Sequence, residues 1–100
     1  MQESVLRKLC LGFIHIHILH HAKKEPFYGS WMIEELLHHG YEISAGTLYP
    51  ILHSLEKDGL LTVEKRIVDG KYRKYYHITS DGETILCEAK LKLRELTKEL

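Results

Sequence analysis

Basic side chains surround one turn-forming dipeptide in this chain of 100 residues. Residues 65–74 contain five Lys or Arg residues and one Asp, which gives this segment a net charge of +4 in a chain that is neutral overall. A local concentration of positive charge attracts phosphate groups even when the whole chain carries none. The cations of this basic segment are Lys65, Arg66, Lys71, Arg73 and Lys74.

The dipeptide at the centre of the basic segment predicts a β-hairpin. Asp69-Gly70 favours a type I′ turn, because both central residues of that turn have positive φ. Two opposed pairs then carry like charges, which destabilises a ribbon by about a fraction of a kcal/mol each unless an anion lies against them. A phosphate backbone would be such an anion; the alternative is a solvated edge ribbon that its charges keep from pairing. The expected register pairs Val68 with Lys71, Ile67 with Tyr72, Arg66 with Arg73, Lys65 with Lys74, and Val63 with Tyr76.

A helix is expected directly before this hairpin, with Ser44 as its N-cap and Gly59 as its stop. Its buried face would consist of Leu48, Ile51, Leu52 and Leu55. Pro50 conflicts with this assignment because it has no N–H to donate beyond the first turn. The helix therefore either bends at Pro50 or begins its regular part nearer Gly46.

A helix with a polar first half, followed at once by a basic ribbon, is how a winged helix-turn-helix contacts duplex DNA. Short hydroxyls and a phenol suit contacts to phosphate and sugar, and none offers the bidentate fork with which Arg reads guanine. We therefore expect specificity to be modest or based on DNA shape. The expected DNA-binding residues are Ser44, Gly46, Thr47, Tyr49, Pro50, His53, Lys65, Arg66, Lys71, Arg73 and Lys74.

Two further helices are expected to complete the DNA-binding domain, over residues 3–22 and about 29–39, with Gly40 as the second stop. Residues 15–18 alternate between histidine and isoleucine as a strand would, so the pattern does not settle whether the last turns of the first helix are helical. The expected fold is mostly α with a small antiparallel β-hairpin, a winged helix-turn-helix over residues 1–79. The inward residues would be Val5, Leu6, Leu9, Cys10, Phe13, Ile14 and Ile18 in the first helix, and Trp31 or Met32, Ile33, Leu36 and Leu37 in the second.

Residues 80–100 predict a C-terminal helix that forms one structural unit with the rest. Ser80 and Glu83 have the spacing of a capping box, and Thr79 is a competing N-cap. The apolar residues recur as in a coiled coil, with Lys and Glu between them. Another copy of the chain is the expected partner, although this helix can also fold back on the first helix. The expected dimerisation residues are Leu86, Ala89, Leu93, Leu96 and Leu100, with Ile85 and Leu91 widening the stripe.

The chain is rich in histidine, with eight residues. His17 and His21 lie one helical turn apart and could chelate a metal, with Cys10 a turn or two away and the pair at residues 38–39 elsewhere. Such pairs also arise by chance in a His-rich chain, so we interpret them as structural or solvent-facing groups that add mild pH sensitivity. Trp31 is interpreted as a core residue rather than a platform for an aromatic ligand. No metal or cofactor is expected.

The chain resembles the PadR family of bacterial transcriptional regulators. The resemblance lies in residues 46–60, GTLYPILHSLEKDGL, in residues 71–79, KYRKYYHIT, and in Gly82 and Tyr28-Gly29. It implies a homodimeric winged-helix regulator of the subgroup with a single C-terminal helix, usually a repressor. The implied partners are a double-stranded DNA operator, a second copy of the chain and an unidentified small-molecule effector or other signal. The DNA-contacting helix would fall on residues 44–55 and the wing on residues 68–73.

The residue pattern and composition also bear on other classes of protein. The arrangement of Ser, His, Cys and Gly residues matches no catalytic motif, so an enzyme is not expected. The apolar run from Leu9 to Leu19 is interrupted by His15 and His17, and neither a signal peptide nor a membrane span is expected. Cys10 and Cys87 favour a reduced, cytoplasmic setting over a disulfide framework. The alternative function is a winged-helix module that binds proteins instead of DNA, whose interface would not weaken steeply with salt.

Overall fold

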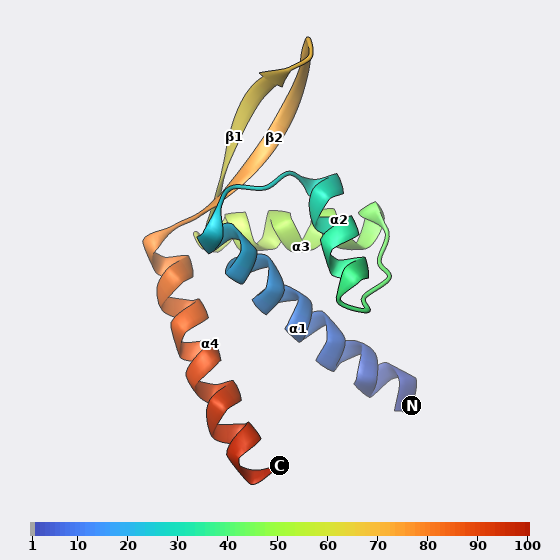
Figure 1. Ribbon diagram of the computed structural model, residues 1–100, viewed down its shortest axis with the longest axis vertical. Helices are drawn as coiled ribbons and strands as arrows, with labels where there is room; N and C mark the ends of the chain where they lie inside the picture. Colours follow the sequence, from blue (N-terminus) through green and yellow to red (C-terminus); the bar gives the residue numbers. More distant parts are fainter. Residues whose placement is uncertain (1) are drawn as a thin grey trace.

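The computed structural model describes residues 2–100 and contains four helices and one two-stranded antiparallel sheet (Figure 1). This confirms a mostly helical fold with a small hairpin. In chain order the elements are α1 (Gln2–Lys24), α2 (Gly29–His38), α3 (Ala45–Lys57), β1 (Leu61–Val68), β2 (Lys71–Ile78) and α4 (Ser80–Glu99).

The hairpin has the predicted register at every pair, from Val68 opposite Lys71 to Val63 opposite Tyr76. Asp69 and Gly70 have φ values of 51° and 76°, as a type I′ turn requires. The base of the hairpin is joined to the α1–α2 connection, because Tyr76 N–H donates to the Phe27 carbonyl (2.8 Å) and Phe27 N–H donates back (3.3 Å). The tip projects away from the helices (Figure 1), so its side chains are free to reach a partner.

One hydrophobic core joins α1, α2, α3, the hairpin base and the beginning of α4. The predicted inner face of α3 is confirmed, since Leu48, Ile51, Leu52 and Leu55 are buried. α3 begins at Ala45 and continues through Pro50, which is exposed. The carbonyl of Gly46, four residues earlier, thereby lacks its helical partner at an exposed position where water can take its place.

The N-terminal half of α1 differs from the prediction. Val5, Leu6, Leu9 and Phe13 are exposed in the single chain, whereas Ile14, Ile18, Leu19 and Ala22 are buried. The physical reason is that α2, α3 and the hairpin base cover only the second half of this long helix (Figure 1). Residues 15–18 are helical, so the predicted helix over residues 3–22 is confirmed through its last turns despite the strand-like alternation there. In α2, Met32 and Leu36 are buried as expected, but Leu37 is exposed.

Thr79, and not Ser80, is the N-cap of α4. Its hydroxyl accepts from Gly82 N–H (3.0 Å) and donates to the Gly59 carbonyl (2.6 Å), so one side chain ties α4 to the end of α3. A Cβ on Gly82 would lie 2.3 Å from the Leu60 carbonyl oxygen, which explains why glycine occupies this position. These contacts fix the direction in which α4 leaves the domain.

Candidate nucleic-acid interface

The beginning of α3 presents a polar surface. Ser44, Gly46, Pro50 and His53 are exposed and Thr47 is half-buried, all opposite the buried leucine face. Ser44 occupies the N-cap position, but its hydroxyl makes no capping hydrogen bond. A helix N-terminus carries partial positive charge, which favours an anionic group placed against it. The open hydroxyl and the helix end therefore offer a phosphate both a donor and a favourable field.

A groove of 260 Å³ joins the third helix to the hairpin. Tyr49 contributes from α3, and Arg73 and Lys74 contribute from β2. The close packing depends on Gly29, because a Cβ there would lie 2.2 Å from the Tyr49 hydroxyl oxygen. The end of the Tyr49 ring thus occupies the space that a side chain at the start of α2 would need. The groove is lined by Tyr28, Gly29, Ser30, Tyr49, Tyr72, Arg73, Lys74 and Tyr76.

Tyrosine rings hold the two opposed arginines. The guanidinium of Arg73 lies 4.1 Å from the ring centroid of Tyr28, and that of Arg66 lies 4.2 Å from the ring of Tyr75. The two rings meet edge to face at 5.7 Å. A cation over an aromatic face is attracted by the ring quadrupole. The like charges on the ribbon are therefore partly relieved within the chain, which weakens the sequence-based expectation that they require an external anion.

Glu64 neutralises one of these arginines. Its Oε1 accepts hydrogen bonds from Arg66 Nη2 (2.9 Å) and lies 2.7 Å from His77 Nε2. The hydrogen bond from Arg66, followed by that from His77, holds the pKa of the Glu64 carboxyl below its usual value. Arg66 is thus already paired, whereas Lys65, Lys71 and Lys74 form no ion pair within residues 2–100. The lysines are the better phosphate ligands.

Two exposed apolar residues lie next to the cations at the hairpin tip. Ile67 and Tyr72 oppose each other and lie on the same face as the Lys65–Lys74 pair, because successive side chains on a strand alternate between its two faces. Apolar side chains beside cations are used by DNA-binding proteins to enter the minor groove. The sequence interpretation missed this pair and Tyr28, although the alternation of side chains along β2 places Tyr72 on the same face as Lys74.

The expected dimerisation residues divide into two groups. Leu86 is buried in the core of the single chain, so it is not open to a partner, and Ala89 and Leu93 are half-buried. Leu96 and Leu100 are exposed, as are Ile85 and Leu91. α4 packs on α1 only over part of its length, and its end diverges from that helix (Figure 1).

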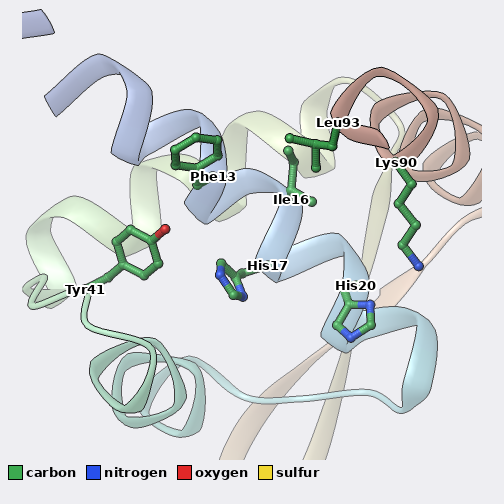
Figure 2. A pocket seen from close by; sticks show the side chains of 7 residues that line it. All are labelled: Phe13, Ile16, His17, His20, Tyr41, Lys90 and Leu93. Carbon is green, nitrogen blue, oxygen red and sulfur yellow. The ribbon is translucent and has the colours of Figure 1, made fainter. Parts of the chain in front are cut away.

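Three of the eight histidines come together elsewhere, between α1 and the end of α2. His17 and His21 on α1 come together with His39 at the end of α2, and Cys10 is not part of the group. Beside them, a cavity of 470 Å³ is lined by residues of α1, α4 and the α2–α3 loop (Figure 2). These three imidazoles are the groups best placed to hold a metal ion in residues 2–100.

Within those residues, every helix is too short or too polar to cross a membrane.

Comparison with known proteins gives a consistent result. Residues 18–88 match the family described as "Transcriptional regulator PadR-like family". The chain is similar to the transcriptional regulator Rv3488 of Mycobacterium tuberculosis (strain ATCC 25618 / H37Rv), with 45% identity over 95 residues that span 95% of this chain and 89% of that protein.

Solved structures agree with this match. A PadR family transcriptional regulator from Eggerthella lenta DSM 2243 superposes with a TM-score of 0.84 and 34% identity, covering 97% of this chain and 86% of that one. A PadR-like transcription factor from Bacteroides fragilis superposes with a TM-score of 0.82 and 34% identity, covering 96% and 94%. These proteins are described as transcription factors or regulators, not as enzymes.

Proposed function

The chain belongs to the PadR-like family of transcriptional regulators, and we propose that it regulates transcription by binding a specific operator sequence in duplex DNA. The observation that carries this proposal is the groove in which Tyr49 of α3 meets Arg73 and Lys74 of the hairpin. One ligand that spans a helix and a basic ribbon in this way is a DNA duplex, whose major groove accepts the helix while a flanking backbone meets the ribbon.

In this proposal the two elements have different roles. The first half of α3 enters the major groove, where Ser44, Thr47 and Tyr49 contact phosphate, sugar and one or two base edges, with Gly46, Pro50 and His53 beside them. The hairpin lies along the adjacent minor groove. Lys65, Lys71 and Lys74 bind phosphates, and Arg73, held on Tyr28, suits a narrow minor groove because its guanidinium is planar and weakly hydrated.

We propose that the chain acts as a homodimer. The exposed apolar residues of α4, Leu96 and Leu100 together with half-buried Leu93 and Ala89, have the spacing of a coiled-coil seam. The exposed first half of α1, with Leu6, Leu9 and Phe13, adds a second apolar surface. Neighbouring exposed apolar residues of this kind are typical of an interaction site. A symmetric dimer would present two copies of α3 to half-sites separated by about one DNA turn, roughly 34 Å.

Repression is the proposed mode of regulation, with release by a small molecule or another signal. A dimer bound across an operator excludes the transcription machinery from the same DNA, and a ligand that binds the free conformation better shifts the equilibrium towards release. The proposed location is the cytoplasm, where bacterial DNA lies. Residues of the DNA-facing groove carry no catalytic role in this proposal.

The test combines selection of DNA with a salt series. Duplexes selected from a random library should be bound tightly, and the slope of log affinity against log salt should become shallower by about 0.9 for each phosphate-binding cation that a substitution removes. Arg73→Ala should weaken binding most on sites with narrow, A·T-rich minor grooves. Lys92→Ala removes one positive charge from exposed α4, away from the groove, and is the matched control. A DNA affinity that does not depend on salt would favour a protein-binding module instead. An equal loss of DNA affinity in Arg73→Ala and Lys92→Ala would do the same.

A further inference from the structure

Three imidazole rings from two helices converge at one point of the molecule. His17 and His21 extend from successive turns of α1, and His39 follows the last turn of α2. One ring nitrogen of each lies within 4.8 Å of the other two. The ring centroids of His17 and His39 are 4.7 Å apart, and those of His21 and His39 are 5.8 Å apart. Residues from distant parts of the sequence thus present nitrogen ligands to a common space.

The most buried of the three has an unsatisfied ring nitrogen. His21 is 9% exposed, and its Nε2 has no hydrogen-bond partner. Glu35 Oε2 is 3.4 Å from this nitrogen, but not in the geometry of a hydrogen bond. Buried polar atoms in proteins are nearly always bonded, so an unpaired one requires an explanation. A bound cation at the meeting point would supply the missing partner.

The protonation states suit metal binding. Burial lowers the pKa of both His17 and His21, and for His17 the neighbouring His39 lowers the pKa further. A lowered pKa favours the neutral ring, which is the form that coordinates metals. The hydrogen bond between His39 Nε2 and Glu35 Oε2 (2.9 Å) lowers the pKa of the Glu35 carboxyl, which stays ionised beside the three rings. A negative charge at this position favours a cation.

We propose that His17, His21 and His39 form a binding site for a divalent transition-metal ion of the Zn²⁺ type, with Glu35 positioning His39. Imidazole nitrogen suits Zn²⁺, Ni²⁺ and Cu²⁺, whereas Mg²⁺ and Ca²⁺ prefer oxygen ligands. Tetrahedral Zn²⁺ with bonds of about 2.0–2.1 Å requires nitrogens about 3.4 Å apart, so the rings must close by at most about 1.4 Å. We infer that this closure combines rotation of the side chains with a small shift of α2 towards α1.

An access route leads to the site from the side of the cavity. His17 lines the 470 Å³ cavity, and Figure 2 shows its ring between those of Tyr41 and His20. His39 is exposed. An ion can therefore reach two of the three ligands from solvent without opening the core.

Metal binding at this point would tie α1 to α2. α2 is followed in the chain by α3, and α4 packs on α1. The site therefore lies between the proposed DNA-binding and dimer-forming parts of the chain. An ion that draws His39 towards α1 would change the position of α2 and, through Gly29 and Tyr49, of the groove. The metal would then act as an effector of DNA binding, a consequence that rests on the proposed function.

The experiment uses the full chain after treatment with a chelator, titrated with Zn²⁺ alone and in competition with a chromophoric chelator. Trp31 is the only tryptophan and its ring meets His21 edge to face at 5.6 Å, so its fluorescence reports on the site when Ni²⁺ is the probe. We expect one ion per chain and a rise in the midpoint of thermal unfolding, because the ion binds the folded state.

His17→Ala and His39→Ala, at accessible positions, should weaken Zn²⁺ binding at least tenfold, and Glu35→Gln about tenfold. His38→Ala is the control, because His38 is exposed and its Nδ1 lies 4.0 Å from Glu35 Oε1, beyond hydrogen-bond distance; this variant should bind as the wild type does.

Stoichiometric binding that His17→Ala and His39→Ala reduce and His38→Ala does not would support the site. Absence of binding, or binding that is equal in all these variants, would overturn it. DNA affinity with and without Zn²⁺ tests the consequence separately. An affinity unchanged by Zn²⁺ in the wild type refutes the effector role and leaves the metal site standing. A chain that binds Zn²⁺ at these histidines but binds no duplex refutes the proposed function and its consequence alone.

Discussion

Replacing Leu96 by Asp should break the proposed dimer. Complete burial of a Leu side chain is worth about 1.5–3 kcal/mol. Leu96 is 50% exposed in the single chain, so covering the remaining half contributes about 1 kcal/mol per copy. Each substitution occurs twice in a symmetric dimer, which gives about 2 kcal/mol or about a 30-fold increase in the dissociation constant. The cost of burying the new carboxylate makes this a lower bound, and the Leu93→Asp/Leu96→Asp double variant should be a monomer.

The assay is sedimentation velocity over a concentration series, with circular dichroism to show that the fold is retained. Leu37→Asp is the matched control, since Leu37 is 54% exposed on α2 and lies outside the proposed interface. It should leave the association state unchanged. A double variant that stays dimeric, or a Leu37→Asp variant that dissociates equally, would refute the assignment of the interface to α4. Specific DNA binding should disappear together with the dimer, because both half-sites must be engaged at once.

Three other outcomes are expected. Tyr49→Phe, which removes only the hydroxyl, should weaken operator binding in a fluorescence anisotropy titration; an unchanged affinity means that this hydroxyl does not touch DNA. Lys71→Ala should weaken binding to operator and random DNA equally and make the salt slope shallower by about one, and a slope equal to that of the wild type would exclude a phosphate contact. Thr79→Ala removes both the N-cap of α4 and the hydrogen bond to Gly59, which should lower the free energy of unfolding by about 1–2 kcal/mol in urea; a change within error would show that Ser80 can replace the cap.

Local rules were sufficient wherever the partner residues are neighbours in the sequence. The register of the hairpin follows from Asp69-Gly70, because only one alignment of the strands is compatible with a two-residue turn of positive φ. The buried stripe of α3 follows from spacings of three and four. The ends of the second and third helices follow from Gly40 and Gly59, which both have positive φ. These are the features that the sequence interpretation predicted correctly.

The same rules could not decide between equal local candidates. Ser80 and Thr79 are both good caps, and Thr79 is the cap in the structure, where its hydroxyl also donates to the Gly59 carbonyl. The apolar stripe of α1 is continuous in the sequence, but its fully buried residues begin at Ile14, and Val5, Leu6 and Leu9 stay exposed. The period of the apolar residues identifies which face of a helix is apolar. It does not show how much of that face other elements of the chain cover.

By itself, the sequence determined the elements, the hairpin register, the basic charge of the hairpin and the resemblance to one family of regulators, because each depends on residues within a few positions of one another. Only the tertiary structure decided which side chains share a site. It placed Tyr28 under Arg73, and His39 with His17 and His21. Such neighbours are set by the angles at which helices and strands pack, and those angles depend on the whole core, not on any local pattern.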